Sequence, residues 1–271
     1  MKIVVFDDGG LLSVETALWV RDHGHEVVMV PAPAGLDPLT REEIADALHD
    51  CAVVIDLAHQ PSPATGTPPG GHDHVGDEAS RLRSWLRSVG GLRRAVLAAG
   101  VRHHVCLSAV GVGRVRGPGA FLALRAREAM IESAGTPYSI LRSTQLFEAA
   151  EGIADAATED GVIRLPPLRV QPVSSTDVAM FLAHLAVSRP VGGVREIAGP
   201  EQVGLERFLR IALAAEAAPH RPVRTHAHSQ FFGARPRPAD LLPGPGAFVA
   251  PTSHRAWLAA RPTPDPGKSS R

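Results

Sequence analysis

Four side chains with acid–base or hydroxyl chemistry follow or end three apolar stretches that have the composition of β-strands. These stretches are KIVVF, CAVVIDLA and HHVCLS. An imidazole exchanges protons near neutrality, and a carboxylate beside a helix N-terminus stays ionised. Such groups can move a proton on one bound molecule or stabilise its charge. The candidate catalytic residues are therefore Asp7, Asp8, His59 and Ser108.

The elements that position these residues alternate between strand and helix. KIVVF, HEVVMV and CAVVIDLA are separated by two segments of helical periodicity, the second opening with a capping box at Thr40 and Glu43. This order indicates βαβ units and a parallel sheet, with ligands bound outside the carboxyl ends of its strands. We predict an α/β, Rossmann-like, doubly wound sheet over residues 1–144, with KIVVF central. A small C-terminal substrate-binding part over residues 145–260, interleaved with the sheet, and a disordered tail over 261–271 complete the prediction.

Composition excludes several classes of protein. The 271 residues contain 28 Lys and Arg against 28 Asp and Glu, so neither nucleic acid nor an anionic membrane is an expected partner. No apolar stretch of about 20 residues is present, and the chain enters a strand without a signal-peptide pattern. We expect a cytoplasmic monomer or homodimer. Cys51 and Cys106 lie in apolar runs and are expected to be buried thiols, not a disulfide.

Several segments, in order along the chain, resemble the NmrA-like group of atypical short-chain dehydrogenase/reductases. They are GVRHHVCLSAVGV, GTPYSILRSTQLFE, IRLPPLRVQPVSSTDVA and LLPGPGAFVAPTSHRAWLA, and the resemblance extends from residue 1 to about 260. It implies a Rossmann domain, a small substrate-binding part and, in most members, NAD(P). It also implies that Gln145, Phe147 and Glu148 form a pocket wall and contact the substrate.

The cofactor loop departs from the family pattern. In G-x-x-G-x-x-G the glycines serve the tight turn, the approach to the pyrophosphate and helix packing. Here these positions hold Asp7, Gly10 and Ser13, so Gly10 alone remains as a candidate cofactor contact. A carboxylate a few ångström from a diphosphate costs on the order of a few kcal/mol at an effective dielectric of ~20. The second strand ends VVMVPAPAG, without a side chain for the ribose before Asp37. We therefore expect no cofactor, with NAD(P)H binding as the alternative.

The catalytic pair of the superfamily is also missing. Ser108 falls on the serine position, but Ala120 or Phe121 falls on the tyrosine position and Leu124 on the lysine position. The only tyrosine, Tyr138, belongs to a strand. Carbonyl reduction by a Tyr/Lys pair is therefore not expected.

Other candidates have weaker signals. Asp56 precedes His59 at the end of the same strand. HDH (His72 and His74) and HAH (His226 and His228) could bind a metal, but neither has further ligands at fixed spacing, which favours solvated loops. Phe231 and Phe232 could form an aromatic lid over the substrate or belong to the core.

Three classes of function follow. The favoured one is a tailoring enzyme of secondary metabolism that performs cofactor-independent cyclisation, isomerisation or elimination on a small apolar organic substrate. The alternatives are an NAD(P)H-dependent oxidoreductase with non-standard catalytic residues, and a non-catalytic NmrA-like sensor or scaffold. The polar side chains expected at the cleft favour the first class over the last.

Overall fold

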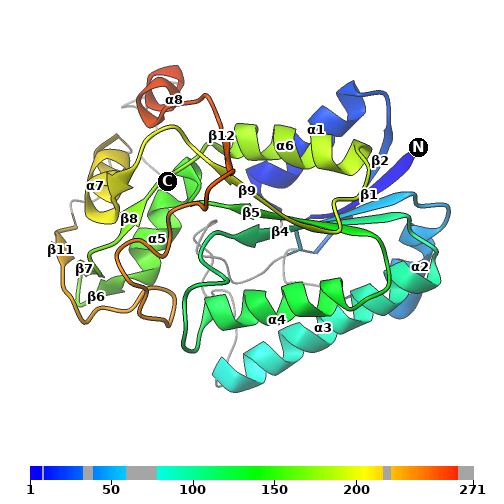
Figure 1. The fold of residues 1–271 in the computed structure, drawn as a ribbon, viewed down its shortest axis with the longest axis horizontal. Helices are drawn as coiled ribbons and strands as arrows, with labels where there is room; N and C mark the ends of the chain where they lie inside the picture. Colours follow the sequence, from blue (N-terminus) through cyan, green and yellow to red (C-terminus); the bar gives the residue numbers. More distant parts are fainter. Residues whose placement is uncertain (8, 33–38, 59–77, 216–220, 262–271) are drawn as a thin grey trace, which may run out of the picture.

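The computed structural model describes residues 1–7, 9–32, 39–58, 78–215 and 221–261 (Figure 1). Its main element is a seven-stranded sheet in which every neighbouring pair of strands is parallel. The predicted Rossmann-like fold, with KIVVF between HEVVMV and CAVVIDLA, is confirmed. The order across the sheet is β12 (Phe248–Val249), β9 (Gly193–Ala198), β5 (Tyr138–Ser143), β4 (His103–Ala109), β3 (Val53–Asp56), β1 (Lys2–Asp7) and β2 (Glu26–Pro31).

Helices cover both faces of this sheet, which explains why Ile3–Phe6 of β1 and Val53–Ile55 of β3 are apolar on both faces. Ile3 and Val5 of β1 pack in one core cluster, whereas Val4 and Phe6 pack in another on the opposite face. Figure 1 shows labelled helices above and below the sheet. Those above are α1 (Leu11–Asp22) and α6 (Ser175–Val187); those below are α2 (Arg41–Leu48), α3 (Glu78–Ala98) and α4 (Ala120–Glu132).

The local signals for helix starts are largely confirmed. Thr40 and Glu43 form the predicted capping box at α2, with reciprocal side-chain and backbone hydrogen bonds. The N-cap of α6 is Ser174, whose hydroxyl accepts from the N–H of Asp177. Segment 78–98 forms one continuous helix, α3.

The C-terminal part lies beyond the carboxyl ends of the parallel strands (Figure 1). It is interleaved with the main sheet, because α6, β9 and β12 return to that sheet. Its own elements are η1 (Phe147–Ala149), α5 (Ala150–Ala156), β6 (Thr158–Glu159), β7 (Val162–Leu165), β8 (Arg169–Val170), β10 (Val203–Gly204), α7 (Leu205–Ala215), β11 (Val223–Thr225) and α8 (His254–Ala260).

Some predictions concern residues that the structure does not describe. Asp8, His59, His72, His74, Asp37 and the tail from Pro262 lie outside the described residues, and the domain boundary at residue 144 stays a prediction. Both cysteines are buried free thiols, as expected. Among the residues that the structure describes, no helix is long and apolar enough to cross a membrane.

Candidate functional site

The turn after β1 combines a glycine of positive φ with a carboxylate. Gly9 has a φ of +82°, a conformation that glycine adopts without strain. Gly10 is the N-cap of α1. An oxygen of the Asp7 carboxylate accepts a hydrogen bond of 2.7 Å from the N–H of Gly9. The Asp7 carboxylate is therefore half-buried and bonded within the turn, beside the start of α1.

The side chains described around this turn do not fit a nicotinamide dinucleotide engaged as in short-chain dehydrogenases. Strand β2 ends at Pro31 without a charged or hydroxyl side chain. Ala120 and Phe121, the candidates for the tyrosine position, and Leu124, at the lysine position, are fully buried and apolar. Gly9 and Gly10 can offer a cofactor only backbone groups. These residues therefore assign no chemical step to a cofactor.

Ser108 belongs to a buried hydrogen-bond network at the carboxyl end of β4. Its hydroxyl donates to the Glu128 carboxylate at 2.6 Å, and the same carboxylate accepts from the Arg142 guanidinium at 2.9 and 2.5 Å. Ser108 and Glu128 are 2% and 4% exposed. The hydroxyl proton thus points to α4, so a catalytic role for Ser108 requires its hydroxyl to rotate or to act as an acceptor.

A second buried network, at the end of β3, was not predicted from the sequence. Arg127 of α4 contacts the Asp56 carboxylate at 2.6 Å, and His104 lies 3.6 Å from the same carboxylate. Burial by itself raises the pKa of Asp56, but the Arg127 guanidinium and the His104 side chain outweigh it and hold that pKa below its ordinary range. Asp56 is therefore a fixed anion inside the molecule.

The sequence carried one signal for both networks. Arg127 and Glu128 fall on the buried face of α4, at helical spacing from Phe121, Leu124 and Ile131. Charged side chains are rarely fully buried unless they are paired, so their place on this face indicates partners in the interior.

The predicted pocket-wall residues divide into three environments. Gln145 is fully buried, and neither polar atom of its amide has a hydrogen-bond partner. Phe147 packs against His254 and Trp257, with ring centroids 4.8 and 5.4 Å apart. The Glu148 carboxylate accepts from the N–H and hydroxyl of Ser175 at the start of α6, and burial raises its pKa. Only Gln145 therefore retains unused hydrogen-bonding capacity.

Phe231 and Phe232, the predicted aromatic lid, are buried. Phe231 packs against Phe121 of α4, with centroids 6.4 Å apart. Phe232 is 8% exposed and lines a pocket of about 710 Å³ in the C-terminal part. The backbone φ of Phe232 is +51°, an uncommon value for an aromatic residue, and it turns the chain at the pocket wall.

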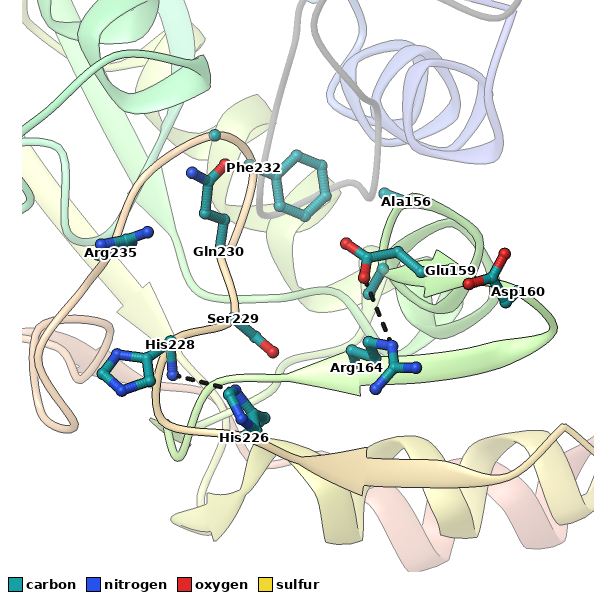
Figure 2. A pocket seen from close by; sticks show the side chains of 12 residues that line it. Ala156, Glu159, Asp160, Arg164, His226, His228, Ser229, Gln230, Phe232 and Arg235 are labelled. Atoms are coloured by element: carbon teal, nitrogen blue, oxygen red, sulfur yellow. Dashed lines mark hydrogen bonds and ion pairs between the residues drawn. The ribbon is translucent and has the colours of Figure 1, made fainter.

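This pocket is lined mainly by polar groups (Figure 2), and we name it the substrate pocket after the role proposed for it below. Figure 2 shows Glu159 and Arg164 on one side and Ser229 and Gln230, together with Phe232, on the other. The Arg164 guanidinium lies 3.4 Å from the Glu159 carboxylate. The lining is completed by two alanines, a glycine and further charged or titratable residues: Ala156, Ala157, Gly233, Asp160, His226, His228 and Arg235.

The two described histidines of this pocket contact each other. The N–H of His228 donates to Nδ1 of His226 at 3.3 Å, and the ring centroids are 5.6 Å apart. Within the described part of the chain, no group of three or more His, Cys, Asp or Glu side chains could hold a metal ion.

No protein-family model matches the sequence, and no curated protein matches it. Solved structures do resemble the fold. MoeE5 in complex with UDP-glucose and NAD matches with a TM-score of 0.69 and 17% identity, over 96% of each chain. The UDP-glucose 4-epimerase of Thermotoga maritima with UDP-glucose matches at 0.67 and 14%, over 95% of this chain and 96% of that one. TunA, an NAD-dependent NDP-hexosamine 5,6-dehydratase of tunicamycin biosynthesis, matches at 0.64 and 14%, over 97% and 99%.

These neighbours establish the architecture predicted from the resemblance. Two of them are by name a UDP-glucose 4-epimerase and an NAD-dependent dehydratase, and this chain has the Rossmann-like fold of all three almost from end to end. The expectation that no cofactor is bound is not supported by this comparison, because the MoeE5 structure contains NAD. The roles predicted for Asp7, Asp8, His59, Ser108 and the pocket-wall residues stay predictions.

Proposed function

We propose that this protein is a tailoring enzyme that modifies a hydroxyl-rich small molecule of the nucleotide-sugar class, using acid–base side chains in place of a Tyr/Lys pair. The substrate pocket carries this proposal. It combines the Glu159–Arg164 pair and the Gln230 amide with the aromatic face of Phe232. Carboxylate, guanidinium and amide groups satisfy hydroxyls, and an aromatic ring covers an apolar ring face.

The substrate class is more polar than the apolar molecule expected from the sequence. Two guanidinium groups, Arg164 and Arg235, line the pocket and can bind the two charges of a diphosphate. The solved structures with UDP-glucose support the same class, because their fold extends over nearly the whole chain.

The chemistry we propose is proton transfer, as in elimination, isomerisation or cyclisation. His226 and His228 line the substrate pocket, whereas Asp7 and Ser108 do not, so the two histidines join Asp7, Asp8, His59 and Ser108 as candidates for this proton transfer. NAD(P)H-dependent redox chemistry is the alternative. The NAD-bound neighbours support the alternative, and Asp7 with the buried Phe121 and Leu124 supports the cofactor-independent reaction.

Titration calorimetry with UDP-glucose tests the substrate class. We expect saturable binding tighter than about millimolar, the weak end of the affinity scale. Arg164→Gln should weaken this binding about tenfold or more, because it removes a charge-assisted contact. Arg169→Gln is the control, since Arg169 is exposed, bonds to Gln202 and does not line the pocket. Absence of heat with UDP-glucose, or equal losses in both variants, would contradict the proposal.

A non-catalytic sensor is the second candidate. It is favoured by Ser108, whose hydroxyl is engaged by Glu128, and by the apolar residues at the Tyr/Lys positions. Alanine variants of Asp7, Asp8, His59 and Ser108 separate the two functions. An enzyme should lose turnover by about 10² or more in at least one variant that still binds substrate. A sensor should show no turnover in the wild type and unchanged binding.

A further inference from the structure

A second pocket, of about 460 Å³, lies in the C-terminal part and shares no lining residue with the substrate pocket. We call it the aromatic pocket. Its apolar surface comes from Phe147 of η1, Phe208 and Ile211 of α7 and Val203 of β10. Phe147 and Phe208 are each 1% exposed, whereas Ile211 is 39% exposed on α7. The pocket therefore has a deep aromatic floor and an open apolar rim.

One imidazole lies among the aromatic rings of this pocket. The centroid of His254, at the start of α8, is 4.8 Å from Phe147, 5.2 Å from Phe208 and 5.7 Å from Trp257. Its Nε2 is buried and has no hydrogen-bond partner. A buried polar atom without a partner costs free energy, so a ligand that supplies one gains affinity.

The protonation state of His254 suits a neutral ligand. Burial lowers the pKa of this imidazole, against the opposing effect of the Glu201 carboxylate. Nearby charges come from Glu201 and Arg207, which also line the pocket. At neutral pH the ring is therefore uncharged. A ligand hydroxyl can donate to Nε2 when Nδ1 carries the proton, and can accept from Nε2–H in the other tautomer.

The opposite wall of the pocket is held in place by close backbone packing. Pro172 and Pro200 line the wall, and they follow Gln171 and Gly199. The N–H of Gly199 donates to the carbonyl of Gln171, and the Gln171 amide donates to the carbonyl of Gly199 at 2.7 Å. A Cβ on Gly199 would lie 1.8 Å from the Pro172 oxygen. The wall is thus pre-formed, which reduces the ordering cost of binding.

We propose that the aromatic pocket is a second binding site, for a small aromatic molecule that carries a hydroxyl group. Its volume lies in the range of about 300–1,000 Å³ typical of small-molecule pockets, and about 150 Å³ is enough to hold benzene. The aromatic floor takes the ring, and His254 Nε2 takes the hydroxyl. This site is separate from the substrate pocket, because the two pockets share no lining residue, and the proposal assigns Phe147, predicted from the sequence as a substrate contact, to this second site.

Phenol and toluene, which differ by a hydroxyl in place of a methyl group, are the probes. The indole N–H signal of Trp257 in a nuclear magnetic resonance titration of the full chain is the readout, since Trp257 stacks on His254. We expect saturable phenol binding with a Kd of about millimolar and a preference over toluene of about fivefold. His254→Phe keeps a ring at this position and should remove the preference.

Ile211→Trp fills the open rim and should abolish phenol binding. Leu97→Trp on α3 is the matched control, because Leu97 is also an exposed apolar helical residue, 53% exposed, and does not line the pocket. The proposal is overturned if phenol causes no saturable shift, if Ile211→Trp binds phenol as the wild type does, or if the preference over toluene survives in His254→Phe. UDP-glucose should leave the Trp257 signal unchanged. The Trp257 signal therefore tests the aromatic pocket alone, and calorimetry with UDP-glucose tests the proposed substrate class.

Discussion

The Arg127 guanidinium lies 2.6 Å from the Asp56 carboxylate, and the two side chains are only 2% and 3% exposed. Arg127 also donates to the carbonyls of Leu107, at 2.9 Å, and of Asp56, at 3.2 Å. One side chain of α4 thus bonds to the carboxyl-terminal halves of both β3 and β4. The predicted catalytic residues follow or end β1, β3 and β4, so this pair holds together two of the three strands on which that prediction depends.

Arg127→Met should lower the free energy of unfolding by about 3–5 kcal/mol, because it leaves the Asp56 carboxylate buried without its partner. The measurement is urea denaturation at neutral pH. Asp56→Asn in the same chain removes the stranded charge and should recover part of the loss. If Arg127→Met lowers the free energy of unfolding by less than about 1 kcal/mol, the Asp56–Arg127 pair is not buried when the protein is in solution.

Acid should destabilise the protein through His103. Burial, with a contribution from His104, lowers the pKa of His103 from 6.5 to about 4. Between these values the unfolded chain binds a proton and the folded protein does not, so stability is lost as the pH falls from 6.5 to 4. After allowance for solvent screening, we expect this loss to be on the order of 2 kcal/mol.

His103→Gln is the control for this titration. Nε2 of His103 lies 2.8 Å from the Ser139 hydroxyl, and a glutamine amide can keep that hydrogen bond without titrating. The difference in unfolding free energy between wild type and variant should shrink as the pH falls from 6.5 to 4. A constant difference over this range would show that His103 does not titrate there.

The parts of the fold that depend on local patterns were predictable from the sequence. Ile3–Phe6 is a short, continuously apolar run, as strands buried on both faces require, and the capping box at Thr40 fixed the start of a helix. The pairing of Asp56 with Arg127, 71 residues apart, was not predictable, because no periodicity specifies which buried charges meet. The glycine pattern was also misleading: it gave no role to Gly9, which adopts the positive φ of the turn.

Two glycines before α4 offer a matched pair of substitutions. Gly117 and Gly119 have φ values of +110° and +90°, so alanine is strained at either position, by about 1–2 kcal/mol. A Cβ at Gly117 meets nothing within 4 Å, whereas one at Gly119 would lie 2.2 Å from the carbonyl oxygen of Phe232.

Gly119→Ala should therefore cost about 1–3 kcal/mol more than Gly117→Ala in thermal or urea unfolding, as overpacking does. It should also weaken UDP-glucose binding, because Phe232 lines the substrate pocket and its carbonyl accepts from the N–H of Ala120 at 3.1 Å. Equal stabilities of the two variants would indicate that the Phe232 turn moves away freely.

The Asp7 carboxylate should reduce the affinity for NADH. It accepts from the N–H of Gly9 at 2.7 Å, at the turn where a diphosphate would dock. Asp7→Asn keeps an oxygen acceptor for Gly9 but removes the charge, so NADH should bind about tenfold or more tighter in calorimetry at low salt. The gain should diminish as salt screens the repulsion. Asp7→Gly combined with Ser13→Gly restores the family pattern and should gain affinity as well. A micromolar isotherm for the wild type, unchanged by Asp7→Asn, would show that the carboxylate does not oppose the cofactor, and would favour the NAD(P)H-dependent oxidoreductase.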